Sequence, residues 1–255
     1  MDVRLPRYAE SYDGYILMKF TSKVQYQQDF LDGRLYFNEL DWFAKCENRG
    51  QGDRNEGASL VENYSNTDYQ SLNIEVIDGE VLLVQRDYSK APEAYKPSTV
   101  HFFSSAENRK VKIICLYTSF LDVKNATVQD FPPNMKDEFG NYGILILNRF
   151  ELFNRLAKAI AEKADCSSGL MGFVNYVELE PGINEWHPFK KEKMRFGYQN
   201  EFRVAFKSDR QGAVILDIGS VRDIAVPVLA EDVDKICIKD GKLKYPLYCS
   251  GYKRL

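Results

Sequence analysis

The chain of 255 residues has only two histidines, His101 and His187. A histidine-rich metal site or a serine–histidine–aspartate triad therefore has little material to draw on. The cysteines are also few, odd in number and scattered, with no paired spacing typical of zinc ligands or of a disulfide framework. We expect reduced and mostly buried thiols at Cys46, Cys115, Cys166, Cys237 and Cys249.

Long apolar runs and an excess of one charge are missing as well. No run approaches the ~18 apolar residues that a membrane-spanning helix needs, and residues 1–6 lack the apolar segment of a signal peptide. We therefore expect a cytoplasmic protein with no membrane partner. The 34 Lys and Arg nearly balance the 37 Asp and Glu, for a formal net charge of -3. Because a dedicated DNA-binding protein carries a global basic surface, any contact with nucleic acid must be local.

The organisation of the chain indicates one folding unit. There is no internal repeat, low-complexity tract or obvious domain break. A chain of this length can bury a full core as one large α/β or α+β domain, or as two small ones. We predict a single domain over residues 1–255.

Two apolar segments predict the strands on which the functional argument depends. Residues 14–20 form a compact apolar run, followed by a helix for which Ser22 and Gln25 supply a capping box. Residues 111–120 predict a buried central strand that turns polar at residues 117–119, where the hydroxyls either line a site or bond neighbouring backbone. The same patterning predicts a strand at 34–37, a hairpin over 72–84, a strand at 143–147, a helix over 149–163 capped by Asn148, and a final hairpin turning at 240–241.

A glycine-containing segment at residues 47–57 is too rich in glycine and charge for regular structure. In one interpretation it is a flexible loop bordering a ligand site, with Asp53 or Glu56 facing that site. In the other, which we favour slightly, it is a solvated surface loop.

A second loop, predicted at residues 181–198, mixes aromatic and basic side chains. Single-stranded nucleic acid favours such a mixture, because its phosphates pair with cations and its bases stack on rings. Alternatively, the aromatic residues anchor the loop to the core while the lysines stay solvated. The residues that we expect to bind an acceptor are Trp186, Lys190, Lys191, Arg195, Phe196 and Tyr198.

The strongest functional signal is Gln199-Asn200-Glu201, which opens a predicted strand directly behind that loop. Residues two apart on an extended chain point to the same side, so Gln199 and Glu201 are expected to face one site. The simpler alternative is that Glu201 and Arg203, also two apart, form an ordinary surface ion pair.

Three spaced motifs together resemble the mono-ADP-ribosyltransferases. They are Leu17-Met18-Lys19-Phe20-Thr21, Tyr117-Thr118-Ser119 and Gln199-Asn200-Glu201, each at a strand end. The resemblance spans roughly residues 15–217 and is nearest to bacterial and prophage-encoded members with a similar late strand, among them toxins and phage-defence effectors. It implies an α+β fold with a split mixed β-sheet and flanking helices, holding NAD in a cleft.

The resemblance also implies roles for individual residues. Glu201 would be the catalytic glutamate and Gln199 the residue that reads the target. A carboxylate near the ribose of NAD can bond a ribose hydroxyl and offset the positive charge that develops as the glycosidic bond breaks. Lys19 would bind the ribose, where the family usually has His or Arg. The other NAD contacts would come from Phe20, Thr21, Ser119, and Tyr36 or Phe37.

The expected activity is therefore NAD-dependent mono-ADP-ribosyl transfer to a macromolecule, either protein or nucleic acid, with RNA the nucleic acid favoured. An antitoxin protein is a further expected partner. One alternative is a non-catalytic binding module on the same fold, for which Lys19 in place of His or Arg is the best argument. A weaker alternative is a metal-dependent nuclease that uses Asp53, Glu56 and a lysine.

Overall fold

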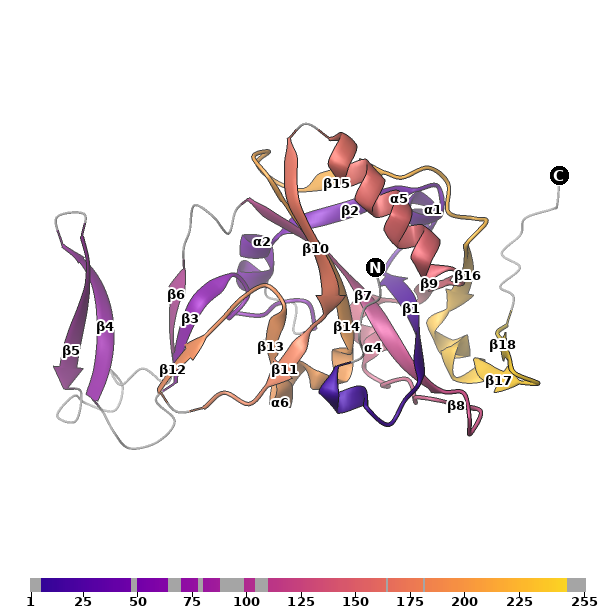
Figure 1. The fold of residues 1–255 in the computed structure, drawn as a ribbon, viewed down its shortest axis with the longest axis horizontal. Helices are drawn as coiled ribbons and strands as arrows, with labels where there is room; N and C mark the ends of the chain where they lie inside the picture. Colours follow the sequence, from indigo (N-terminus) through magenta and orange to yellow (C-terminus); the bar gives the residue numbers. More distant parts are fainter. Residues whose placement is uncertain are drawn as a thin grey trace.

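The computed structural model describes residues 6–46, 50–63, 70–77, 80–87, 99–103, 110–163, 165–180 and 182–246. Its main feature is a large sheet in which every pairing is antiparallel (Figure 1). The expected α+β class is confirmed, but the expected mixed sheet is wrong, because the parallel pair β11–β13 forms a separate small sheet. The six strands on the main path, in spatial order, are β10 (Cys166–Phe173), β14 (Glu201–Ser208), β7 (Val111–Asp122), β1 (Gly14–Thr21), β9 (Tyr142–Ile146) and β16 (Ala225–Leu229).

The sheet divides along one edge of β7. Strand β1 pairs with β7 only from Gly14 to Met18, and then continues along β9 as far as Thr21. Further down the same edge, β2 (Arg34–Glu39) pairs with β7 at Asn38 and Glu39, and β2 in turn carries β15 (Val214–Asp217). The pairing therefore passes from β1 to β2 near Cys115, and the sheet separates there into two arms.

Apolar side chains cover both faces of the sheet, as expected for strands buried on both sides. On β1, Leu17 belongs to a core that also contains Phe30 and Leu152, whereas its neighbour Met18 faces a second core with Met135. Helices α1 (Val24–Leu31) and α5 (Arg149–Glu162) cover the first face, and α4 (Met135–Phe139) and the 3-10 helix η4 (Ala230–Lys235) cover the second. None of the described helices is long and apolar enough to cross a membrane.

The sequence predicts an N-terminal cap for each of the helices α1 and α5. The side chain of Asn148 accepts a hydrogen bond from Glu151 N at 3.1 Å, which confirms the predicted cap of α5. The predicted capping box at Ser22 is wrong. Lys23 is the N-cap residue of α1, and no side chain caps that helix.

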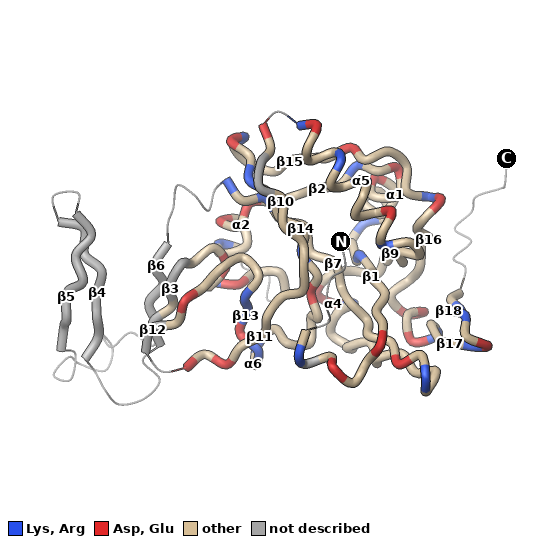
Figure 2. The backbone as a smooth tube through the Cα atoms, viewed as in Figure 1, with Lys and Arg blue, Asp and Glu red and all other residues tan. Residues whose placement is uncertain are grey.

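The remaining elements are short. The predicted hairpins are present as β4 (Gln70–Ile77) with β5 (Glu80–Asp87) and as β17 (Cys237–Lys239) with β18 (Lys242–Lys244), although the turn at 78–79 lies outside the described residues. Positions of both charge signs are interspersed along the backbone (Figure 2). The other elements are η1 (Arg7–Ala9), α2 (Leu40–Lys45), β3 (Ala58–Asn63), β6 (Thr99–Phe103), β8 (Thr127–Val128), β11 (Asn175–Val177), β12 (Gly182–Glu185), β13 (Lys190–Glu192), α6 (Lys193–Phe196) and η3 (Gly197–Gln199).

Candidate functional site

The three motif strands lie side by side in the order β14, β7, β1 (Figure 1). Glu201, the first residue of β14, is opposite Tyr117 of β7, and Tyr117 is opposite Met18 of β1. The fold thus brings the three motifs, far apart in sequence, to one region next to the division of the sheet.

Glu201 is held by two cations in a buried position. Its Oε1 accepts from Lys191 Nζ at 2.7 Å and its Oε2 from Arg203 Nε at 2.8 Å, and only 6% of the residue is exposed. Burial raises the pKa of the Glu201 carboxyl, but Lys191 and Arg203 outweigh burial and lower this pKa to about 2. Glu201 is therefore an ionised carboxylate at neutral pH. The pair with Arg203 exists, but the expectation that it lies at the surface is wrong.

Gln199 is joined to Glu201 through a shared cation. Its Oε1 accepts from Lys191 Nζ at 2.8 Å, and its Nε2 donates to Gly50 O at 2.6 Å. Gln199 belongs to a 3-10 turn rather than to the strand, and Asn200 between them adopts the left-handed conformation with φ 41 and ψ 50. Lys191, not strand alternation, therefore brings Gln199 and Glu201 to one site.

The segment over residues 50–57 covers this site. Glu56 accepts two hydrogen bonds of 2.7 Å from the Arg203 guanidinium, and Arg203 also donates to Pro188 O. Asp53, Glu56 and Gly57 are all buried, so the favoured expectation of a solvated surface loop is wrong for residues 50–57; residues 47–49 lie outside the described residues. A buried guanidinium is costly unless its charge is paired, and Glu56 supplies the second carboxylate that Arg203 needs.

Asp53 completes a group that we call the charge cluster: Asp53, Glu56, Lys191, Glu201 and Arg203. Asp53 Oδ1 accepts from Asn55 N at 2.9 Å, while Oδ2 is buried and has no hydrogen-bond partner among the described residues. Burial raises the pKa of Asp53, and Lys191 and Arg203 act against this rise. Among the described residues, the cluster therefore contains one buried carboxylate oxygen without a hydrogen-bond partner.

Lys19 lies at the division of the sheet. Its Nζ donates to Cys115 O at 3.0 Å, where the pairing of β7 passes from β1 to β2. Burial lowers the pKa of the Lys19 ammonium, while Cys115 and Glu201 act to raise it. Lys19 thus bonds a strand carbonyl and also interacts electrostatically with Glu201.

The other residues expected to bind NAD are scattered. Phe20 is buried against Tyr117 and Phe131, and Thr21 donates to Tyr142 O at 3.3 Å. Phe37 packs in the first core with its ring 4.9 Å from that of Phe206, and Tyr36 is 58% exposed on the opposite face of β2. The structure does not bring Tyr36 or Phe37 to the charge cluster, because β2 alternates between the core and solvent.

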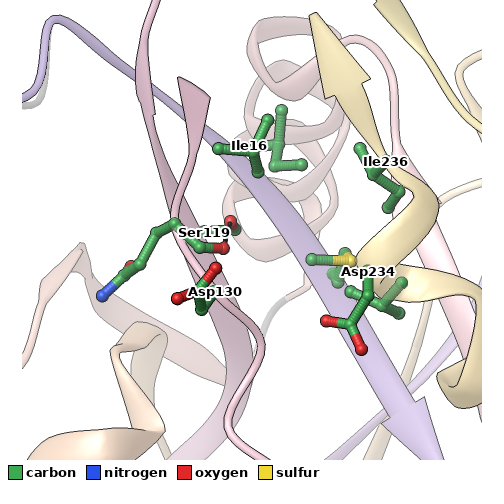
Figure 3. A pocket seen from close by; sticks show the side chains of 9 residues that line it. Ile16, Ser119, Asp130, Asp234 and Ile236 are labelled. Atoms are coloured by element: carbon green, nitrogen blue, oxygen red, sulfur yellow. Dashed lines mark hydrogen bonds between the residues drawn. The ribbon is translucent and has the colours of Figure 1, made fainter. Parts of the chain in front are cut away.

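Ser119 is placed differently from these residues. It is 2% exposed, its Oγ donates to Gln129 O at 3.2 Å, and it lines a cavity on the second face of the sheet (Figure 3). Gln129 Oε1 also accepts from Asn200 Nδ2 at 3.1 Å. Ser119 is therefore connected through Gln129 to the residue that precedes Glu201.

The predicted loop at 181–198 is more ordered than expected, since it contains β12, β13, α6 and η3. Lys191, Trp186 and Phe196 are at most 5% exposed, and the ammonium of Lys191 lies 4.7 Å from the centre of the Phe196 ring. These three expected acceptor contacts are therefore directed inward. The residues of this set that remain reachable from solvent are Lys190, Arg195 and Tyr198.

Sequence reasoning missed Tyr176 and Glu138, which support the region of the motif from other segments. Tyr176 Oη accepts from Glu201 N at 2.8 Å, and Tyr198 Oη donates to Glu138 on α4. A single tyrosine or glutamate in a polar segment has no spacing that marks it. These contacts depend on which segments the fold brings together.

Within the described part of the chain, no three His, Cys, Asp or Glu side chains gather as a metal site. Comparison with protein-family models, with curated proteins and with solved structures gave no match. The class that fold and site define is therefore an α+β protein with a divided antiparallel sheet and a buried charge cluster at the head of its β14 strand.

Proposed function

We propose that this chain is an NAD-dependent mono-ADP-ribosyltransferase that modifies a macromolecular acceptor, as toxins and phage-defence effectors do. The observation that carries the proposal is an ionised Glu201 at the head of β14, next to β7 and β1 where the sheet divides. The resemblance of the three motifs to this superfamily adds support, since the fold places their strands side by side.

In this reaction NAD supplies an ADP-ribosyl group, which is transferred as nicotinamide leaves. Glu201 offers a carboxylate that accepts a hydrogen bond from a ribose hydroxyl and offsets developing positive charge. Lys191 and Arg203 keep that carboxylate ionised and fix its orientation. Gln199, bonded to the same lysine, is positioned to meet the acceptor.

Lys19 is the remaining residue that we assign to NAD: its charge acts on Glu201, and we expect it to contact the ribose. Phe20 is committed to contacts with other rings, and Thr21 and Ser119 donate to backbone carbonyls, so we assign these three residues no NAD contact.

Because Glu201 is only 6% exposed, the groups packed around it must shift before NAD reaches it, and we expect segment 50–57, which contacts Gln199 and Arg203, to be among them. Lys190, Arg195 and Tyr198 then remain for the acceptor, which we take to be protein or RNA.

The test is transfer from labelled NAD to a total cell lysate, with nicotinamide release measured in parallel. Glu201→Gln is expected to lower both rates by about 100-fold or more, as for loss of a group that stabilises transition-state charge. Glu178→Gln is the matched control, since Glu178 is a largely exposed glutamate with only a 3.7 Å contact to Lys193. Full activity of Glu201→Gln, or no nicotinamide release by the natural chain, contradicts the proposal.

A non-catalytic binding module is the second candidate, and the buried pairing of Glu201 and Arg203 favours it. This candidate predicts NAD or RNA binding by titration with no release of nicotinamide. The nuclease alternative loses support, because both oxygens of Glu56 are bound to Arg203 instead of being free for a metal ion. Magnesium-dependent RNA cleavage in the absence of NAD would restore it.

A further inference from the structure

A second feature of the molecule is a cavity of about 320 Å³ between β1, β7 and η4 (Figure 3). Its apolar lining includes Ile16, Met18, Val233 and Ile236. Its polar lining is formed by Ser119, Gln129, Asp130 and Asp234, and the two carboxylates lie on opposite sides of the space. The volume is at the small end of ligand pockets, which span roughly 300–1,000 Å³.

The charged side chains that line this cavity are all negative. No Lys, Arg or His lines it, and neither Asp130 nor Asp234 forms an ion pair with a described residue. The nearest lysine in sequence, Lys235, is paired with Asp232 on the same 3-10 helix. Both aspartates are exposed to solvent, and without a basic neighbour in the lining they leave a negative potential at the cavity that a cation would offset.

A buried phenol lies next to the residues that line the cavity. Tyr117 is 4% exposed and is the register partner of Met18, which lines the cavity. Burial raises the pKa of Tyr117, and the nearby carboxylates of Asp234 and Asp130 raise it further. Its Oη lies next to the side chain of Asn200, whose hydrogen bond acts to lower the pKa of the phenol. Tyr117 does not line the cavity, and the charges of Asp130 and Asp234 act on this phenol from beside it.

We propose that this cavity binds a small organic cation, an ammonium or guanidinium group on a short aliphatic stem. The charged group lies between Asp130 and Asp234, and Ser119 Oγ, which already donates to Gln129, accepts a hydrogen bond from it. The aliphatic stem packs on Ile16, Met18 and Ile236. A hydrated metal ion is disfavoured at these apolar side chains, because it would lose water there without gaining oxygen ligands. The same carboxylates repel phosphate, so the diphosphate of NAD lies elsewhere.

The test is isothermal titration of the full chain with butylammonium and butylguanidinium, which separates the two sources of positive charge. Both Asp130→Asn and Asp234→Asn are expected to weaken binding of the favoured cation by about tenfold or more. Asp232→Asn is the matched control, because it removes a carboxylate from η4 outside the cavity. It is expected to change the affinity by less than about twofold. Asp130 and Asp234 are exposed, whereas Asp232 is partly buried and paired with Lys235, and circular dichroism verifies the folding of all three variants.

Several results would overturn the assignment. They are absence of binding by both cations, equal binding of neutral 1-butanol, an equal loss in Asp232→Asn, and displacement of the cation by magnesium chloride. Tighter, carboxylate-dependent binding of 1-methylnicotinamide would instead give the cavity to the nicotinamide ring. No NAD is present in the titration, so its outcome is independent of whether the chain transfers ADP-ribose.

Discussion

The charged residues bonded to Glu201 are buried, and their burial makes each of them depend on an oppositely charged partner. Arg203 is 1% exposed and Lys191 is 2% exposed, yet each is bonded to Glu201. Removing such groups from water costs several kcal/mol per ion, and only close pairing with additional hydrogen bonds offsets that cost. Glu56 and Gln199 supply those further bonds, so each charge depends on its neighbours.

The lowered pKa of Glu201 makes stability depend on acid. Its folded-state pKa of about 2 lies below the ordinary value of 4.5, so its contribution is complete above pH 4.5 and is lost as the pH falls toward 2. Each tenfold change in proton affinity corresponds to about 1.4 kcal/mol, so the loss is on the order of 3 kcal/mol. Urea unfolding at pH 7 and at pH 3 measures the part of this loss that is complete by pH 3, about 2 kcal/mol. Glu201→Gln is expected to lower stability at pH 7 and to lose less on acidification.

The exposed variant Glu178→Gln controls for loss of a glutamate and is expected to keep the full acid sensitivity of the natural chain. If the natural chain and Glu201→Gln lose the same free energy between the two pH values, Glu201 is not the group responsible. The lowered pKa would then be incorrect.

Sequence reasoning at the level of residues succeeded where local spacing carries the signal. The Gln199-x-Glu201 spacing pointed to two side chains that do lie together, although the expected reason is wrong, because a shared bond to Lys191 joins them instead of strand alternation. Lys191 was one of several basic residues in a segment expected to contact an acceptor, and nothing local distinguishes the lysine that is buried. Its position follows from Glu201 and Gln199, which approach it only in the folded chain.

At the level of elements, the segment 50–57 is held by contacts at both of its ends. Gly50 O accepts from Gln199, Asp53 N donates to Phe43 O at 3.1 Å, and Glu56 binds Arg203. Glycine and charge in a sequence do predict irregular backbone, as found here. They do not show whether such a segment faces solvent, because its buried partners come from distant elements.

Gly50 is needed for close packing against α4. A Cβ at this position would lie 2.4 Å from both Cβ and Oε2 of Glu138, so the backbone of one segment must shift. Gly50→Ala is expected to destabilise the fold by about 1–3 kcal/mol, the usual cost of overpacking. Chemical denaturation measures the change. Gly172→Ala is the control, since a Cβ there meets nothing within 4 Å, and its effect is expected to be near zero. Equal effects of the two substitutions would refute the packing argument.

Glu56 is the contact through which segment 50–57 covers Glu201. Glu56→Gln removes the negative charge that pairs with Arg203 from this segment. Arg203 then keeps only Glu201 as a buried carboxylate partner, so we expect segment 50–57 to open more often. Hydrogen exchange of the Glu56 and Ala58 amides, which donate to Asp53 O and Asn55 O, measures opening. Both are expected to exchange about tenfold or more faster than in the natural chain.

Amides of α5, remote from the segment, serve as the internal reference and are expected to exchange at unchanged rates. Faster exchange throughout the molecule would indicate global destabilisation instead of local opening. Unchanged exchange in the segment would show that Glu56 does not hold it closed.

At the level of the whole molecule, the strands were easier to predict than their arrangement. Apolar runs at residues 14–20 and 111–120 predicted strands that the structure contains as β1 and β7. The antiparallel order and the division at Cys115 depend on pairings between distant segments, and a fully apolar strand does not specify its partners. Burial on both faces explains why alternation was weak in these strands.

The two cores on opposite faces of the sheet are expected to unfold together, because each central strand contributes to both. Leu17 and Met18 are adjacent on β1, both fully buried, and belong to different cores. Leu17→Ala and Met18→Ala are each expected to cost about 2–5 kcal/mol and to lower the Tm of one calorimetric transition by roughly 5–15 °C. Leu170→Ala, at a 62% exposed leucine of β10, is the control and is expected to leave that Tm nearly unchanged. If the protein showed two calorimetric transitions and each substitution lowered the Tm of only one, the two faces would fold as separate units. One cooperative sheet instead predicts a single transition whose Tm both substitutions lower.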